Sequence, residues 1–157
     1  SPLEISALTS GQFSGWVPTG YSFPVLAPDH TLAGSTPVCR FYGNPSAGLD
    51  SHFYSASPKE CGEVRTKFPE AWLLESENVF RVFPADAQTG ACPADTEEVR
   101  RLYNRRADAN HRYTDKDDVA LSMLPKGYVP EGYGPSALPT AFCVPKADEN
   151  VTCTAAA

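Results

Sequence analysis

The stretch RFY at residues 40–42, followed by SHFYS at residues 51–55, decides the fold because it returns later in the chain. Its second copy is RLY at residues 101–103, followed by NHRYT at residues 110–114. In each copy two short runs of alternating character flank a polar turn, which predicts a β-hairpin. A hairpin that occurs twice indicates a domain built from repeated units, none of which buries its apolar face alone.

A second repeated feature sets the length of the unit. Trp16, Trp72 and Tyr128 follow one another at intervals of 56 residues, and each begins a short apolar run. The same interval aligns SPKE at residues 57–60 with SPLE at residues 1–4. Residue 1 therefore corresponds to the middle of a unit, and we expect two full units and the second half of a third, cut from a longer parent.

Each unit is expected to fold in the same order, with a hairpin, a short helix and two further strands. Ser57 and Pro58 are a typical N-cap and first residue for such a helix. The expected strands are 23–28, 37–42, 52–55, 79–84, 99–103, 111–114 and 141–145, with others beginning at the three aromatic residues; the expected helices are 1–10, 57–68 and 115–123.

Threefold periodicity with four strands and a helix per unit predicts a mainly β domain with short helices. We expect a β-trefoil-like antiparallel barrel of three units of about 50 residues, with the first incomplete at its N-terminus. The units span residues 1–36, 37–91 and 92–145 of a single domain, and residues 146–157 are expected to form a flexible tail.

Composition limits the classes of partner. The net charge of −6 argues against a nucleic-acid partner, which needs a basic surface. The chain has no run of about eighteen apolar residues, so no membrane-spanning helix is expected. An apolar fraction of 41% is sufficient for a packed core.

Five cysteines without zinc-site spacing indicate a disulfide framework and an oxidising compartment, so we expect a secreted, extracellular protein. The preferred pairs are Cys39–Cys61 and Cys92–Cys143, which leave Cys153 over. Cys143–Cys153 is a competing pair that the sequence leaves open.

The repeated stretches resemble the DUF5648 repeat family. The resemblance rests on VCRFY at residues 38–42, SHFYSA at 51–56, EC at 60–61, NHRYT at 110–114 and VPEGYGP at 129–135, and it covers about residues 1–145. It implies a secreted or cell-surface bacterial accessory module, of trefoil-like arrangement, appended to a parent protein. It implies no ligand and no catalytic residue.

Two groups of residues are candidates for binding a sugar. Each of the pairs His52–Tyr54 and His111–Tyr113 projects from one face of a strand, since residues i and i+2 share a face. Aromatic rings at Trp16 and Trp72 and polar loop residues complete the set; the loop residues are Asn44, Asp50, Asn104 and Asn110. Each of these groups also has a structural interpretation. In it the repeated pairs are scaffold, the aromatic residues are core and the loop residues are turn formers.

Catalytic and metal-binding motifs are not found, so we expect no enzyme activity, no cofactor and no metal site. The sequence favours a non-catalytic module that anchors a parent protein to polysaccharide or to a cell-surface glycan. The alternatives are a protein-binding module, such as an inhibitor of extracellular proteases or an adhesion domain, and a structural spacer.

Overall fold

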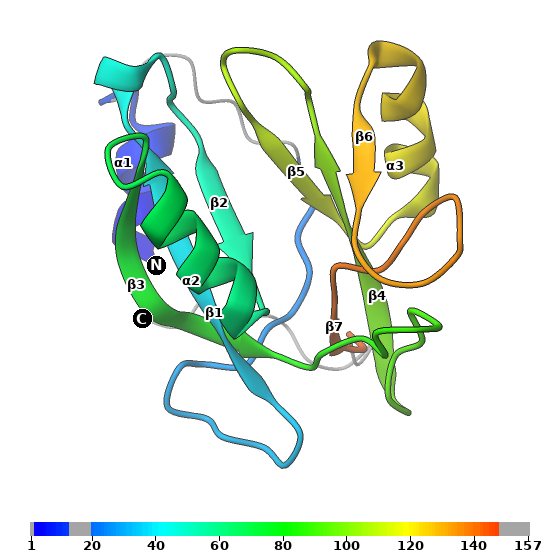
Figure 1. Cartoon of the computed structure of the whole chain (residues 1–157). Helices are drawn as coiled ribbons and strands as arrows, with labels where there is room; N and C mark the ends of the chain where they lie inside the picture. Colours follow the sequence, from blue (N-terminus) through cyan, green and yellow to red (C-terminus); the bar gives the residue numbers. More distant parts are fainter. Residues whose placement is uncertain (1, 13–19, 148–157) are drawn as a thin grey trace.

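The computed structural model describes residues 2–12 and 20–147 of the chain (Figure 1). Its helices are α1 (Pro2–Thr9), α2 (Pro58–Lys67) and α3 (Asp117–Met123), with the short 3-10 turns η1 (Pro45–Ala47) and η2 (Leu124–Lys126). Its strands are β1 (Thr36–Gly43), β2 (His52–Ser55), β3 (Trp72–Val82), β4 (Thr96–Tyr103), β5 (His111–Thr114), β6 (Val129–Glu131) and β7 (Phe142–Pro145).

The strands form two antiparallel sheets that lie side by side (Figure 1). The first has the order β2-β1-β3 and, with α2, makes up what we call the leading unit. The second has the order β5-β4-β6, with β7 also paired to β4, and with α3 makes up the trailing unit. The mainly β fold with short helices that the sequence predicts is therefore present.

The two hairpins pair in the same register. Arg40 lies opposite Tyr54 in the leading unit, as Arg101 lies opposite Tyr113 in the trailing unit. Two residues further along the first strand, Tyr42 lies opposite His52, and at the corresponding place in the trailing unit Tyr103 lies opposite His111. Equal register places the repeated arginine, histidine and tyrosine side chains on one face of each hairpin.

The described residues form two open sheets and no closed barrel, so the β-trefoil-like barrel is not confirmed. A barrel needs backbone pairing that continues around the whole sheet. Within the described part of the chain, the backbone link between the units is the bridge of Phe83 with Cys143, and side chains make the remaining contacts.

Two expected strands differ from the structure. The expected strand at residues 23–28 is reduced to one bridge, in which Leu26 pairs with Arg81. Pro24 and Pro28 flank that bridge and lack the N–H donors that a longer ladder needs. In the leading unit the two strands expected after the helix run together as the single long strand β3, and the strand expected at Trp16 lies outside the described residues.

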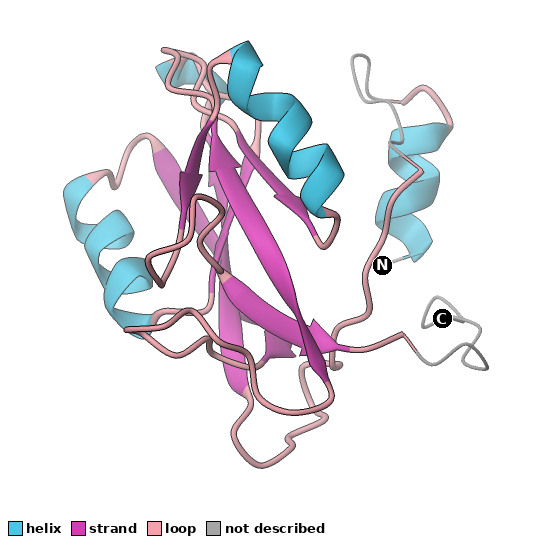
Figure 2. Ribbon diagram, turned by 90° about the vertical axis from the view of Figure 1, so that its right-hand side faces the viewer, coloured by secondary structure: helices cyan, strands magenta, loops and turns pink. Residues whose placement is uncertain are grey.

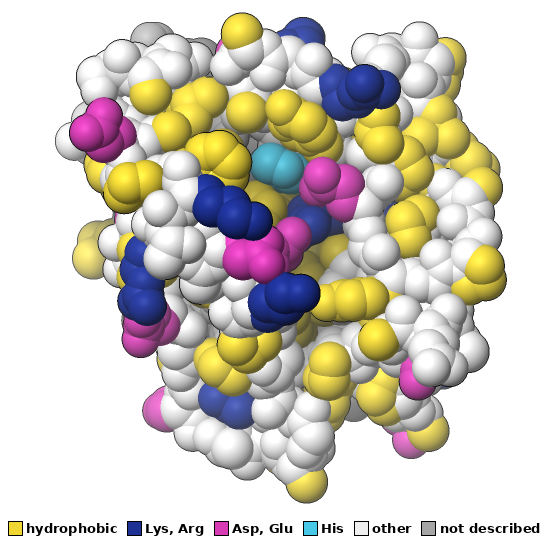
Figure 3. All heavy atoms as spheres, in the orientation of Figure 1, with side chains coloured by type: hydrophobic (Ala, Val, Ile, Leu, Met, Phe, Trp, Pro, Cys, Tyr) yellow, Lys and Arg dark blue, Asp and Glu magenta, His cyan; other side chains and the backbone are white. Residues whose placement is uncertain are grey.

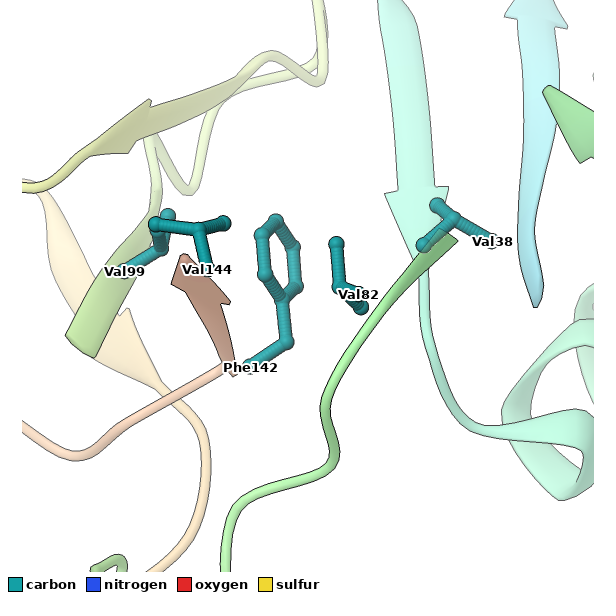
Figure 4. Close-up of a cluster of buried hydrophobic side chains, with 5 residues drawn as sticks. All are labelled: Val38, Val82, Val99, Phe142 and Val144. Carbon is teal, nitrogen blue, oxygen red and sulfur yellow. The ribbon is translucent and has the colours of Figure 1, made fainter. Parts of the chain in front are cut away.

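The main core lies between the two sheets. Phe142, at 2% exposure, stands in the middle of a cluster with Val38 and Val82 from the leading unit and Val99 and Val144 from the trailing unit (Figure 4). Because both units contribute, neither could bury this apolar surface alone.

α2 and α3 each pack on one face of the sheet of their own unit. α2 packs its Cys61 and Val64 against Cys39, Phe41 and Phe53. In the trailing unit, Ala120 of α3 joins a second small cluster on the outer face of β4. Ser57 caps α2 by accepting a hydrogen bond from the backbone N–H of Glu60, as the SPKE stretch predicts.

Two disulfides join Cys39 to Cys61 and Cys92 to Cys143, the pairs that the sequence predicts. Cys153 and the expected tail beyond residue 147 lie outside the described residues. The disulfides close loops of 22 and 51 residues, which in the chain-entropy model contribute about 3 and about 4 kcal/mol. Two disulfides in one small domain are more typical of extracellular proteins.

Replacing Phe142 by alanine tests whether the shared core holds the units together. We expect the free energy of unfolding in urea to fall by about 3–5 kcal/mol, because a fully buried ring is lost and a cavity remains. Phe68→Ala is the matched control, since Phe68 is 52% exposed, and it should change stability by less than about 1 kcal/mol. Equal losses in the two variants would contradict this description of the core.

Candidate functional site

A buried arginine lies at the junction of the two units. Arg101 of β4 is 8% exposed, and its two terminal nitrogens donate hydrogen bonds of 2.9 and 2.8 Å to the two carboxylate oxygens of Glu60 in α2. On its other side, Arg101 Nε lies 2.9 Å from Glu131 Oε2 of β6, in an ion pair that is poorly aligned for a hydrogen bond. A bidentate arginine–carboxylate pair is strong and directional, so it fixes α2 against the trailing sheet.

The two carboxylates are held in the ionised form. Burial alone would raise the pKa of Glu60, but the hydrogen bonds and charge of Arg101 outweigh it, and the pKa lies below its ordinary value. The pKa of Glu131 is lowered in the same way: burial opposes ionisation, and His111 and Arg101 favour it more strongly. At neutral pH neither group carries a proton to donate.

Tyr113 attaches the trailing hairpin to the leading one. Its hydroxyl donates a 2.9 Å hydrogen bond to the carbonyl oxygen of Tyr54 and accepts one of 2.9 Å from the backbone N–H of the same residue. The backbone N–H and C=O of Tyr54, on the edge of β2, are thus both hydrogen-bonded to a side chain. Burial raises the pKa of the Tyr113 phenol above its ordinary value, so it remains a hydrogen-bond donor.

Aromatic rings of the leading unit cover the same junction. Phe53 lies 5.0 Å from the guanidinium carbon of Arg101 and 4.9 Å from the ring of His111. The Trp72 ring centroid lies 6.1 Å from that of His111, and the His111 ring also stacks on Tyr103 at 5.0 Å. His111 Nε2 is 3.5 Å from Glu131 Oε2, and its Nδ1 has no hydrogen-bond partner among the described residues.

A pocket of about 250 Å³ opens beside this junction, between the N-terminal part of α2 and the segment that follows β6. We call it the Tyr133 pocket. Polar and charged side chains line most of it, together with the exposed Tyr133 and with Phe142. The polar and charged lining residues are Ser55, Ser57, Lys59, Glu60, Glu63 and Arg101.

Figure 3 shows the face that Figure 1 presents to the viewer. Near its middle, acidic, basic and histidine side chains gather among hydrophobic ones in a hollow.

Tyr133 is held in place by the backbone on both sides of it. Its N–H and C=O pair with Thr140 at 2.8 and 3.0 Å. A Cβ on Gly132 would lie 2.5 Å from the carbonyl oxygen of Thr140, and one on Gly134 would lie 2.4 Å from that of Thr89. Both positions therefore require glycine, and the exposed ring projects from a rigid base.

Of the residues that the sequence predicts for binding, Asn44 and Asp50 lie in the turn of the leading hairpin. The amide of Asn44 caps η1 and donates to the carbonyl of Glu70, so its hydrogen bonds stabilise the turn. Asp50 is exposed and accepts a 2.9 Å hydrogen bond from the Tyr42 hydroxyl. Neither residue lines the Tyr133 pocket.

Asn104 and Asn110 shape the corresponding loop of the trailing unit. Asn104 is 5% exposed, and its side-chain oxygen accepts hydrogen bonds from the backbone N–H groups of Arg106 and Asn110. Its side-chain nitrogen donates to the carbonyl of Asp108. The loop is thus organised from within by one buried amide.

The predicted histidine and aromatic residues divide between the two units. His111 and Tyr113 come together with Trp72 and the backbone of Tyr54 at the junction. His52 lies elsewhere, with its Nε2 3.1 Å from Glu75, and Tyr54 stacks its ring on Phe80 at 5.7 Å. Trp16 lies outside the described residues. Whether any of these residues binds a ligand stays a prediction.

Sequence reasoning missed several residues that make up the junction and the pocket: Tyr133, Lys59, Glu60, Glu63, Arg101 and Glu131. One signal for Tyr133 was available, because an aromatic residue between two glycines is poorly suited to a strand interior. Glu60 and Arg101 are 41 residues apart, and no local pattern connects them.

Among residues 2–12 and 20–147, no group of histidine, cysteine and acidic side chains could hold a metal ion. The described helices are all too short or too polar to cross a membrane. Comparison with family models, curated proteins and solved structures gives no match for this chain.

The pH dependence of stability tests the charge arrangement at Arg101. A carboxylate whose pKa is lowered on folding stabilises the protein above its unfolded pKa of about 4.3, and this contribution is lost as the pH falls through the folded value. Glu60→Gln should therefore lower the free energy of unfolding at pH 7 by about 1–3 kcal/mol and reduce its slope between about pH 5 and 3.

Urea unfolding at a series of pH values measures this effect. Glu63→Gln is the matched control, because Glu63 lies on the same helix and pairs with the exposed Lys67. It should follow the parent curve. A Glu60→Gln curve parallel to that of the parent protein would show that Arg101 does not hold Glu60 in its ionised form.

Proposed function

We propose that the chain is a non-catalytic extracellular binding module that holds a parent protein on a polysaccharide or a cell-surface glycan. The observation that carries the proposal is the Tyr133 pocket, where an aromatic ring stands 37% exposed on a rigid base beside hydroxyl and charged groups. Secretion, the three-unit trefoil-like arrangement and the resemblance to the DUF5648 repeat family belong to the same proposal.

The chemistry of the pocket suits a sugar. The C–H face of a pyranose packs against an aromatic ring, and its hydroxyls need donors and acceptors at fixed positions. Ser57, Lys59 and Glu63 supply such groups on the helix side of Tyr133. A volume of about 250 Å³ matches one sugar residue of a chain, so binding at a single site would be weak.

The ionisation of the carboxylates supports a non-catalytic role. Cleavage of a glycosidic bond needs a general acid whose pKa is raised so that it holds a proton near neutral pH. Despite their burial, Glu60 and Glu131 have lowered pKa values, because Arg101 favours the ionised form of Glu60, and His111 and Arg101 favour that of Glu131. This pair is therefore suited to holding Arg101 in place and poorly suited to donating a proton.

Electrophoresis in gels that contain a soluble polysaccharide tests the proposal; β-glucan, xylan, mannan, pectin and chitosan form a suitable panel. We expect at least one to retard the protein, and Tyr133→Ala to weaken that binding at least ten-fold, or about 1.4 kcal/mol. Tyr133→Phe should retain most of the binding because it keeps the ring.

Phe68→Ala is the matched control for loss of an exposed aromatic, since Phe68 does not line the pocket. It should bind as the parent protein does. Failure of every polysaccharide to retard the parent protein, or equal retardation of the Tyr133→Ala variant, would overturn the proposal.

A second candidate function is protein binding through the loop of residues 104–110. Arg105 is exposed at its tip with a φ of 52°, and Arg106 is fixed to Asp108 by two hydrogen bonds of 2.9 and 3.1 Å. A rigid loop loses little entropy on binding, which is the property that an inhibitor loop needs.

Assays against extracellular proteases that cleave after arginine test this second candidate. If the loop occupies an arginine-specific pocket, the chain should inhibit at least one of them, and Arg105→Ala should weaken inhibition at least ten-fold. Inhibition that Arg105→Ala leaves unchanged, or its absence across the panel, would contradict the role of the loop.

A further inference from the structure

Helix α2 is the common wall of two pockets. On one side, Lys59, Glu60 and Glu63 line the Tyr133 pocket. On another side, residues of α2, β1 and β3 enclose a second pocket of about 220 Å³, which we call the disulfide pocket. Figure 2 shows α1, next to the N-terminus, on the opposite side of the strands from α2, and no described residue of α1 lines the disulfide pocket. A change at one pocket can therefore reach the other through α2.

The Cys39–Cys61 disulfide forms part of the wall of the disulfide pocket, because both of its cysteines line it. Cys39 is only 2% exposed, whereas Cys61 is half-buried. Neither Cys92 nor Cys143, which form the other disulfide, lines either of the two pockets. A small reagent that enters the disulfide pocket therefore meets the Cys39–Cys61 bond, and it meets that bond on the Cys61 side.

Gly62 leaves open space in the pocket next to Cys61. A Cβ at this position would meet no atom within 4 Å beyond its chain neighbours and the backbone of its own helix. Gly62 lies inside α2, where glycine is a poor helix former. The turn of the helix that carries Cys61 is thus both less stable and more open than it would be with a larger residue at position 62.

The ion pair at the exposed end of the pocket does not close it. Arg65 Nη1 lies 3.0 Å from Glu77 Oε1, and the two side chains are 59% and 75% exposed. An ion pair between such exposed side chains contributes little free energy, so it opens easily. Entry to the Cys61 side of the disulfide is therefore not prevented by charge pairing.

A thiolate that enters this pocket can exchange with the disulfide. Its sulfur attacks the Cys61 sulfur, a new S–S bond forms between them, and the Cys39–Cys61 bond breaks. The electron pair of the broken bond leaves on Cys39 as a thiolate, which takes up a proton. The apolar neighbours of Cys39, Phe41 and Phe53, disfavour its charged form, so the neutral thiol is the product.

The bond that breaks is a main attachment of α2 to its sheet. None of the residues of α2 is fully buried. Its remaining contacts include the packing of Val64 on the cluster around Phe41 and the pairing of Glu60 with Arg101. A short helix with so little buried surface opens locally once its covalent link is lost.

We propose that the Cys39–Cys61 disulfide is a thiol-exchange site, at which a low-molecular-weight thiol forms a mixed disulfide with Cys61 and releases α2 from β1. Release of α2 displaces Lys59, Glu60 and Glu63, which form the helix side of the Tyr133 pocket. Exchange therefore weakens binding at that pocket, a consequence that rests on the proposed function. The exchange itself and the release of α2 do not depend on any glycan.

Incubation of the full chain with a mixture of reduced and oxidised glutathione tests the exchange site. After acid quenching and digestion with trypsin, mass spectrometry reads each of the five cysteines on its own peptide, because lysine or arginine residues separate all of them. We expect glutathione to appear on Cys61 at least ten-fold faster than on Cys92 or Cys143. Cys153 is counted separately and does not affect this comparison.

Gly62→Leu tests whether the reagent enters through the disulfide pocket. Leucine fills the open space beside Cys61 and should slow glutathione attachment to Cys61 at least ten-fold, while both disulfides still form. Gly62→Ala is the matched control, because it strengthens the helix in the same way and adds only a methyl group. It should exchange at a rate within about three-fold of the parent protein.

Hydrogen exchange of the purified glutathione adduct tests the release of α2. Backbone amides of α2 should exchange at least ten-fold faster than in the parent protein, while those of β4, with the buried Val99 and Leu102, keep their protection. For any polysaccharide that retards the parent protein, the adduct should bind at least ten-fold more weakly. Retardation by no polysaccharide would contradict the proposed function, and the mapping and hydrogen exchange would still decide the exchange site.

Three results would overturn the proposal. One is attachment of glutathione to Cys92 or Cys143 as fast as to Cys61. Another is a Gly62→Leu variant that exchanges at the rate of Gly62→Ala, because the reagent would then not use the pocket. The third is an adduct in which the amides of α2 keep their protection, or in which β4 loses protection equally, because the bond would then not control α2 in particular.

Discussion

The pairing of Arg101 with Glu60 and Glu131 is the interaction on which the arrangement of the two units depends. A guanidinium at 8% exposure is tolerated only when carboxylates compensate its charge, and here one comes from each unit. This requirement fixes the start of α2 against β4 and β6. The Tyr133 pocket lies between those same elements, so its shape follows from the ion pair.

Repeated and non-repeated residues have different surroundings. The repeated residues His111 and Tyr113 contact the leading unit directly, through the ring of Phe53 and the backbone of Tyr54. In the Tyr133 pocket, Lys59 and Glu63 are positions that vary, since the 56-residue interval aligns them with Leu3 and Ala7. A repeat that serves first to join units leaves specificity to the positions that vary, and Lys59 and Glu63 are such positions beside Tyr133.

Local patterns in the sequence were enough to predict the hairpins and the cap at Ser57. They gave the two observed disulfides as the preferred pairs, with Cys143–Cys153 left open as a competitor. Each depends on residues close in the chain or on the repeat itself. Barrel closure could not be predicted in this way, because it depends on whether strand edges of different units meet, and the proline-flanked segment at Leu26 pairs only briefly. The contact of Glu60 with Arg101 was equally inaccessible, since a bidentate pair between distant residues leaves no periodic signal.

Chemical-shift mapping with short oligosaccharides tests most directly the claim that the junction of the two units forms the binding site. Amide signals of a ¹⁵N-labelled protein would be followed while a fragment of the retained polysaccharide is added. The account predicts saturable shifts concentrated at Gly132, Tyr133 and the first turn of α2, with little change at Asp50 or His52. Shifts centred on the hairpin turn around Asn44 and Asp50, with Tyr133 unaffected, would contradict it.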